Sequence, residues 1–316
     1  MPVFSMQEQK NKRLAISLLV LIGITVAVYW LSTAERTENI DKDLFRVADL
    51  TTADRVVLES PNGKVALTFN GTRWKVNDRY DADRDMIDVL MATLREAEPK
   101  RPVAASVQDS LSAQLDKNGV KVSVWSGGQT LKRFTAGGNE LKTQAYFKNE
   151  QTGQVYVMTI PGYRVYVAGI LELTENQWRD KYAFAFNWRN FVSLQAEFPD
   201  KPAENFKVAM QGKLFGIEGL ARTDTAKLNT FLDQVSLLTV NEYLEPGKYT
   251  DSLTQVKPLM TITVQDIAKR EYSLSIFRDG TGVVPGLLQK KQGAVFNRLK
   301  IQPILRPKSF FQARER

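Results

Sequence analysis

The chain has 316 residues, of which 43 % are hydrophobic and 25 % are charged, and its formal net charge is +8. These proportions are typical of a globular chain with room for two domains of ordinary size. The sequence contains no cysteine and no histidine. Disulfides, histidine-based zinc sites and Ser-His-Asp or Cys-His catalytic groups are therefore excluded.

An uncharged apolar segment of 18 residues begins at Leu14 and ends at Leu31. As a helix it would be about 27 Å long, close to the ~30 Å hydrocarbon thickness of a bilayer. Tyr29 and Trp30 stand at its C-terminal end, where aromatic rings favour the headgroup level. The segment therefore predicts a transmembrane helix, with these four residues as its membrane anchor.

The flanks of this segment indicate its orientation. Lys10, Lys12 and Arg13 precede it, and positive residues favour the cytoplasmic side. We therefore expect a single-pass protein of the cell inner membrane with a cytoplasmic N-terminus and most of the chain in the periplasm. One alternative is a cleaved signal peptide that ends near residues 32–34, although the apolar regions of signal peptides are usually shorter. The other alternative is a buried core helix.

Beyond the apolar segment, the pattern favours β-strands with occasional helices. Short alternating apolar runs at residues 56–58, 65–69 and 74–76 are separated by the turn signals 61–63 and 70–71, which predicts a three-stranded meander. Ile87, Leu90, Met91 and Leu94 then follow helical spacing, and strand patterns resume from Val120 to Ile160. The first unit is thus predicted to be β-rich with one helix.

The pattern recurs further along the chain. A shift of 141 residues carries the helical positions onto Leu228, Phe231, Leu232 and Val235, and it also aligns two of the strands. We interpret this as an internal duplication; two unrelated α+β domains with a similar pattern are the alternative. The predicted fold class is α+β, a transmembrane helix followed by two tandem, internally repeated antiparallel-sheet-plus-helix units.

These patterns divide the chain into six predicted segments. They are a cytoplasmic tail (1–13), the transmembrane helix (14–31), a polar stalk (32–50), a first periplasmic unit with a connecting helix (51–188), a second unit (189–308) and a basic tail (309–316). Thr174 and Gln177 form a capping-box pattern, which predicts the start of the connecting helix.

The densest group of carboxylates resembles the start of a calcium-binding loop but departs from it at two essential positions. Asp81, Asp83, Asp85 and Asp88 form this group. Met86 replaces the required glycine and Ala92 replaces the bidentate Glu. Acids at a helix N-terminus bond its free N–H groups, so we interpret the group as a cap, and Thr223 and Asp224 as its counterpart. No metal or cofactor is predicted.

Glycine pairs and strand aromatics offer two further candidate features. Glycines at 127–128, 137–138 and 280–282 lack the setting of a phosphate-binding loop and are interpreted as hairpin turns. Aromatic side chains on the predicted strands could stack on sugar rings, although such residues are more often half-buried sheet positions. They are Trp125, Tyr146, Tyr156 and Tyr166.

The positive charge is concentrated near the C-terminus. From residue 290 onward there are eight cations and one acid, so the rest of the chain is close to neutral and a nucleic-acid surface is not predicted. These cations could dock a protein partner or anionic lipid headgroups, where each contributes about 1 kcal/mol. The docking candidates are Lys290, Lys291, Arg298, Lys300, Arg306 and Lys308. A final strand over residues 295–304 with a basic solvent face, followed by a frayed tail, is the alternative.

Part of the chain resembles a bacterial family of unknown function. The resemblance covers residues 50–198, and more weakly the second unit, and its marks are Trp74, the acids that open the first helix, and Arg179-Asp180-Lys181. Members are single-span membrane proteins with repeated β-rich periplasmic units, often encoded beside gliding-motility-type ABC transporter genes. The resemblance implies an envelope protein that works with a transporter and offers no catalytic motif.

We therefore expect a non-catalytic, membrane-anchored partner or scaffold subunit of an ABC transporter or gliding-motility-type envelope complex. Its partners would be integral membrane subunits and the lipid bilayer, with self-association also open. A membrane-tethered module that binds envelope polysaccharide or peptidoglycan is the alternative function. A histidine-independent hydrolase would require two carboxylates on facing strands.

Overall fold

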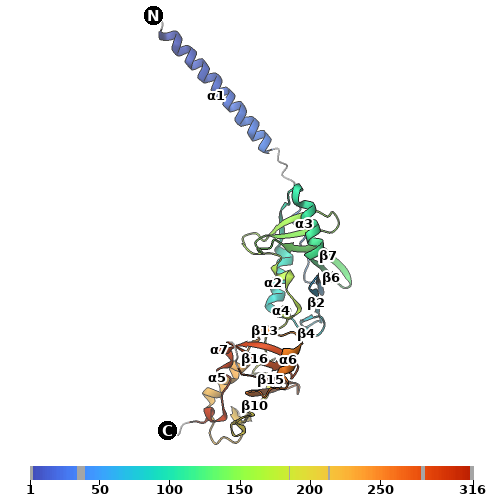
Figure 1. Cartoon of the computed structure of the whole chain (residues 1–316), viewed down its shortest axis with the longest axis vertical. Coiled ribbons are helices and arrows are strands. Elements are labelled where there is room, and N and C mark those ends of the chain that lie inside the picture. The colour runs from blue at the N-terminus through green and yellow to red at the C-terminus, as the bar shows by residue number, and fades with distance from the viewer. Residues whose placement is uncertain (1–2, 34–39, 185, 213, 279–281, 314–316) are drawn as a thin grey trace.

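The computed structural model describes residues 3–33, 40–184, 186–212, 214–278 and 282–313. A long N-terminal helix, α1 (Val3–Thr33), is followed by two β-rich units arranged one after the other (Figure 1). We call residues 40–178 the first unit, residues 183–313 the second unit, and residues 179–182 between them the connector.

Helix α1 contains a segment, Asn11–Val28, that is long and apolar enough to cross a membrane. Its described large apolar side chains are 50–68 % exposed, and Leu14 is 68 % exposed. Such exposure is unlike that of a core helix, which buries at least one apolar face against the protein. The side chains of Tyr29, Trp30 and Leu31, and residues 34–39 of the predicted stalk, lie outside the described part of the chain.

The first unit is a nine-stranded antiparallel sheet with the order β4-β3-β2-β1-β6-β7-β8-β9-β5. Its strands are β1 (Arg55–Ser60), β2 (Gly63–Phe69), β3 (Trp74–Val76), β4 (Tyr80–Asp81), β5 (Glu98–Pro102), β6 (Val120–Ser126), β7 (Gln129–Gly138), β8 (Ala145–Asn149) and β9 (Val155–Thr159). Its helices are α2 (Arg84–Glu96), α3 (Ala105–Asn118), the 3₁₀ helix η1 (Gly169–Glu172) and α4 (Glu175–Trp178).

Local sequence explains the first half of this unit. Strands β1, β2 and β3 form the predicted meander, with turns at the predicted sites. Helix α2 buries Ile87, Leu90 and Leu94, as its spacing predicts, against the core face of the sheet. Asp83 caps α2, because its carboxylate accepts the backbone N–H groups of Asp85 and Met86. The predicted capping box of α4 is also present.

The second unit is an eight-stranded antiparallel sheet with the order β12-β11-β10-β14-β15-β16-β17-β13. Its strands are β10 (Phe191–Glu197), β11 (Phe206–Gln211), β12 (Leu214–Ile217), β13 (Glu242–Tyr243), β14 (Met260–Asp266), β15 (Glu271–Ile276), β16 (Val283–Leu288) and β17 (Gln292–Asn297). Its helices are the 3₁₀ helix η2 (Pro202–Glu204), α5 (Thr225–Ser236), α6 (Lys248–Leu253), α7 (Arg298–Ile301) and the 3₁₀ helix η3 (Lys308–Phe311).

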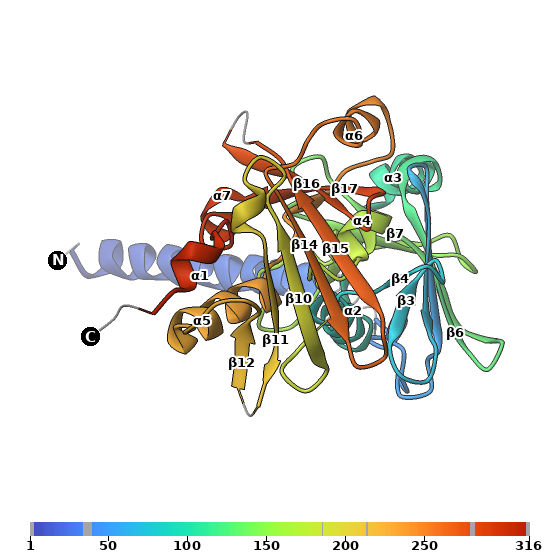
Figure 2. The same ribbon diagram turned by 90° about the horizontal axis from the view of Figure 1, so that it is seen from below.

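Apart from β4, the two sheets have the same strand order when β10 is compared with β1 and β14 with β6. The cross-strand pairs also correspond, since Leu58 faces Val65 in the first sheet and Ala196 faces Phe206 in the second. Helix α5 follows β12 as α2 follows the β3–β4 hairpin, and it buries all four positions predicted for its apolar face. Figure 2 shows α5 and α7 on the same side of the second sheet.

Two segment boundaries before the second unit differ from the prediction. Phe45 and Val47, placed in the polar stalk, are buried in the first core, where the Phe45 ring meets those of Phe134 and Phe147. Ala183 and Phe184 belong to the second core, so the units meet near residue 180 rather than 188. In both places two buried residues fix the chain to a core.

The C-terminal part also differs from the predicted strand and frayed tail. Strand β17 ends at Asn297, whose side chain accepts the Leu299 N–H and starts α7. Phe311, placed in the basic tail, is fully buried and its ring lies 5.2 Å from those of Phe206 and Phe231. Residues 309–313 are therefore part of the second unit, while residues 314–316 lie outside the described range.

The predicted glycine turns have mixed outcomes. Glycines 127 and 128 form the β6–β7 turn with positive φ angles, as predicted. Gly137 and Gly138 instead lie inside β7, where a Cβ on Gly138 would collide with the Tyr166 ring, so close packing explains them. Of the third predicted turn, only Gly282 lies within the described residues.

Candidate functional site

The connector bonds to both units and forms the centre of the junction between them. On the first unit, the Asp180 N–H donates to the Asp81 carbonyl over 2.8 Å. Just before the connector, the Asp83 N–H donates to the Trp178 carbonyl over the same distance. On the second unit, the Val240 N–H donates to the Lys181 carbonyl over 2.7 Å. The connector therefore acts as a short strand that is shared by the two units.

Arg179 is the central side chain of the junction. It is only 7 % exposed, and its guanidinium carbon lies 3.7 Å from the ring centre of Tyr80 and 3.6 Å from that of Tyr243. One Nη group donates to the side-chain carbonyls of Asn176 and Gln292, each over 3.1 Å. Because Tyr80 belongs to the first unit and Tyr243 to the second, one cation joins both through its two faces.

Burial determines the protonation of this cluster. It lowers the pKa of Arg179, an effect that the surrounding Tyr243 and Tyr80 rings oppose, and it raises the pKa of Asp180. It also raises the pKa of Tyr243 to about 12, so this hydroxyl stays protonated and donates to the Asp180 carbonyl over 2.6 Å. The junction thus combines a buried cation with hydrogen bonds whose donors and acceptors keep the same protonation state near neutral pH.

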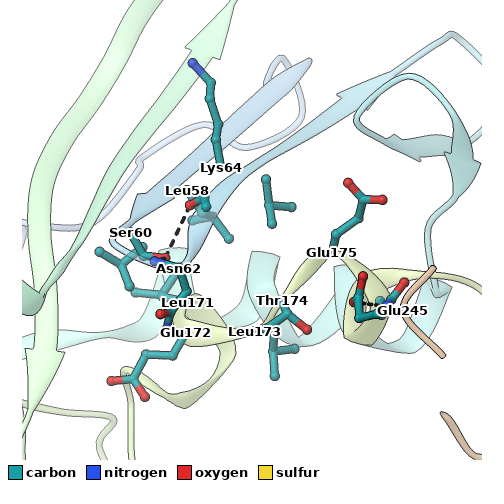
Figure 3. Close-up of a pocket in the computed structure, with 14 residues that line it drawn as sticks. Leu58, Ser60, Asn62, Lys64, Leu171, Glu172, Leu173, Thr174, Glu175 and Glu245 are labelled. Atoms are coloured by element: carbon teal, nitrogen blue, oxygen red, sulfur yellow. Dashed lines mark hydrogen bonds between the residues drawn. The ribbon is translucent and has the colours of Figure 1, made fainter. Parts of the chain in front are cut away.

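A cavity of about 400 Å³ lies beside the junction. It is lined by the β1–β2 turn, by the segment from Leu171 to Asn176, and by Glu245 of the second unit (Figure 3). Three carboxylates border it, but Glu172 and Glu175 point in different directions (Figure 3). Glu172 binds the Tyr166 hydroxyl over 2.6 Å and also contacts Lys142, while Glu245 accepts from Asn176 over 2.6 Å.

Hydrolysis of a glycoside needs two carboxylates that converge on one bond. Within the described lining of this cavity, each of the three carboxylates is held by its own partner, with Asn77 bonding Glu175. This arrangement is suited to fixing the segment from η1 to α4 against the first sheet and against Glu245 of the second unit. The geometry of the cavity therefore supports a structural use of these acids.

Within the acidic group at the start of α2, Asp83 has the predicted capping role. Asp83 is the N-cap, and Asp85 lies in the first turn. Asp81 pairs with Arg73 at 2.8 Å and with Lys75 at 2.5 Å. Burial on its own would raise the pKa of Asp81, but its bonds to Lys75 and Arg73 outweigh burial and lower it.

The six predicted docking cations do not form one surface. Lys290 and Lys291 occupy the β16–β17 turn, next to Gln292 at the junction. Strand β17 has six residues, about 20 Å, and it separates that turn from Arg298 and Lys300 of α7. Lys300 donates to the Thr239 hydroxyl over 2.6 Å. Arg306 and Lys308 lie beyond α7, at the end of the second unit.

The four aromatic residues suggested for sugar stacking are also dispersed. Tyr166 packs on Gly138 and bonds Glu172, and Tyr146 donates to the Gln144 side chain over 2.9 Å. Trp125 lies under Arg133, and Tyr156 packs on the first core. The four side chains therefore serve separate packing roles in the described structure.

The sequence marked Arg179 only as part of the Arg-Asp-Lys step and gave no signal for its ring partners. Tyr80 and Tyr243 lie far from it along the chain, so no local pattern predicts the stack. An arginine followed directly by Asp180 between two predicted units was the available sign of an ordered connection.

The fold and junction define a two-unit β-rich protein preceded by one helix able to span a membrane. A family model described as a domain of unknown function, DUF4340, matches residues 74–258, more than half of the chain, and the chain belongs to this family. The match begins at β3, includes the connector with Tyr80 and Tyr243, and ends just before β14. Neither the curated proteins nor the solved structures include a significant match.

Proposed function

We propose that this protein is a non-catalytic, membrane-anchored periplasmic partner or scaffold subunit of an ABC transporter or gliding-motility-type envelope complex. The observation that carries this role is the exposed apolar surface of α1, beside two units whose own apolar residues form closed cores. Such a helix is stable when a bilayer or an apolar partner shields its side chains from water. Basic residues before the apolar segment of α1 support a cytoplasmic N-terminus in the inner membrane.

We also infer that the two units are tandem copies of one repeated unit. The equal strand order, the corresponding cross-strand pairs and the equivalent capped helices α2 and α5 support a duplication. The Arg179 stack then gives this pair of units a fixed mutual orientation. A rigid two-unit body at the membrane surface is well suited to hold partner subunits in place.

Co-purification from membranes tests the partner role. The full chain, tagged at its C-terminus and solubilised in mild detergent, is expected to retain subunits of an ABC transporter. A variant in which residues 1–33 are replaced by a cleavable signal peptide is the control, since it keeps both units and loses the anchor. Recovery of the anchored chain alone, with the transporter in other fractions, would contradict the proposed role.

A further inference from the structure

The two units are closed at their ends by the same backbone pattern. In the first unit Ala82 bridges Arg179, and in the second Thr223 bridges Gln312. The N-cap residues bond in the same way, as Asp83 N–H donates to the Trp178 carbonyl and Asp224 N–H to the Phe311 carbonyl, each over 2.8 Å. Trp178 and Phe311 are both fully buried.

These bridges define matched positions on the two ends. Arg179 matches Gln312, Asn176 matches Ser309, Tyr80 matches Ala221, Asp81 matches Arg222 and Glu175 matches Lys308. At the first end these positions are buried or half-buried. The second unit contacts Asn176 and Arg179, the connector bonds Asp81, and Asn77 of the first unit bonds Glu175. On the second unit four of the five are exposed and Lys308 is half-buried. We call this surface, residues 221–222 with 306–312, the end face.

The end face differs from its counterpart in charge. Asp81 and Glu175 of the first unit are acids, whereas the matched Arg222 and Lys308 are cations. Arg306 adds a third positive charge, and none of these three cations forms an ion pair with another residue in the described ranges. Two acids lie nearby: Asp224, which pairs with Lys227 at 3.6 Å, and Glu204, which accepts the Ser309 N–H over 2.9 Å.

A groove of about 290 Å³ between α5 and residues 303–310 borders the end face at Arg306 and Phe310. The half-buried Phe310 ring lies in it, with the Lys227 ammonium at 5.1 Å and the Arg306 guanidinium carbon at 4.7 Å from its centre. The groove therefore offers an apolar surface between two cations. Such a combination fits a carboxylate-rich segment that also carries an apolar side chain.

We propose that the end face is a docking surface for an acidic segment of a partner protein. A protein partner is favoured because the matched Asn176 and Arg179 are contacted by protein, namely Glu245, Tyr243 and Gln292 of the second unit. The end face carries Arg222, Arg306 and Lys308 without an ion pair in the described ranges, so the segment that binds it is expected to be negatively charged. This inference rests on the proposed function as a partner subunit and adds the site and charge of the contact.

Site-specific photocrosslinking in living cells tests this surface in the full-length, membrane-anchored chain. A photoreactive phenylalanine analogue replaces the exposed Gln312, and the partner peptide in the product is mapped by mass spectrometry. We expect a discrete product whose peptide is rich in Asp and Glu. Arg222→Asp with Lys308→Glu, which installs the matched residues of the first unit, should lower its yield about tenfold, equivalent to ~1.4 kcal/mol.

Lys248→Glu with Lys269→Glu is the matched control, because it makes the same kind of charge change at two exposed lysines of the same unit. It should leave the yield unchanged. The milder Arg222→Gln with Lys308→Gln should lower the yield by about threefold, and it replaces the acidic variant if that chain fails to fold. Loss of product in both the test and control variants would overturn the docking surface.

Other outcomes separate the docking surface from the proposed function. No product at Gln312, a product with lipid only, or an unchanged yield in the charge variants would overturn the docking surface. If a transporter subunit still co-purified in that case, the proposed function would stand without the docking surface. An acidic partner at Gln312 that belongs to no transporter or envelope complex would support the surface and contradict the proposed function.

Discussion

The ends of the two units have the same backbone pattern and different surroundings. At the end of the first unit, the residue after the bridge enters a connector that bonds the second unit, and Arg179 is stacked between rings from both. At the end of the second unit, the matched Gln312 is exposed, near cations that form no ion pair within the described part of the chain. The comparison teaches that one unit end can either join a neighbour within the chain or present a charged surface.

The largest expected effects come from the matched core residues that close the units. Trp178→Ala and Phe311→Ala should each lower the free energy of unfolding by about 4 kcal/mol, because each leaves a large cavity under a capped helix. Chemical denaturation of the full chain in detergent measures both. A loss below about 1 kcal/mol in only one variant would mean that the two ends are not equivalent in packing.

Arg179→Ala should separate the two ends most clearly. We expect a loss of about 2 kcal/mol, because the variant removes both ring contacts and leaves the Asn176 and Gln292 carbonyls without this donor. The matched Gln312→Ala should change stability by less than about 0.5 kcal/mol. Faster protease cleavage of the connector in the Arg179 variant alone is the readout of a loosened junction.

Arg179→Lys tests whether charge or shape holds the junction. A lysine keeps the positive charge but lacks the planar group that stacks on two rings. We expect cleavage of the connector nearly as fast as in Arg179→Ala. Wild-type resistance in the lysine variant would show that a point charge suffices, and the ring contacts would then have no special role.

Removal of a helix cap should have a smaller effect on the stability of either unit. Asp83→Ala should destabilise the first unit by about 1 kcal/mol, because two N–H groups of α2 lose their acceptor. Asp224→Ala should act in the same direction on α5, where hydrogen bonding to the Lys227 backbone lowers the pKa of Asp224. Asp83→Asn and Asp224→Asn are the controls, since an asparagine cap retains the acceptor.

The smallest expected effect is a pH dependence that belongs to the junction. Burial raises the pKa of Asp180, so the folded chain binds this proton more tightly than the unfolded chain. Stability should therefore fall as pH rises through the interval between the unfolded and folded pKa values. Asp180→Asn should remove this slope and stabilise the chain at pH 7 by about 1 kcal/mol or less; an unchanged slope would contradict this assignment.

The parts of the fold that sequence predicted are those with strong local patterns. The β1–β3 meander, α2, α5 and the capping box of α4 each follow from apolar spacing and turn or cap residues within a few positions. Helix α3 was missed because it buries only Leu115 and has no clear apolar face. The burial of Phe45 was missed because polar residues surround it in the sequence.

The junction was beyond local prediction for a different reason. Tyr80 and Tyr243 are distant from Arg179 in sequence, and their meeting depends on how two sheets close. The same holds for the cations, since one basic stretch of sequence is divided by β17 between the junction and the end face. The sequence shows that positive charge is concentrated near the C-terminus, but only the strand geometry shows which cations share a surface.

The absence of cysteine from the sequence allows the most direct test of a membrane-anchored periplasmic protein. Single cysteines are introduced at the exposed Ser309 and, separately, at Gln9, and intact cells with a permeabilised outer membrane are treated with a maleimide that cannot cross the inner membrane. Ser309→Cys is predicted to react in these cells, and Gln9→Cys only after the inner membrane is broken. Protection of Ser309→Cys until lysis, or recovery of the labelled chain as a soluble protein, would contradict the anchored arrangement.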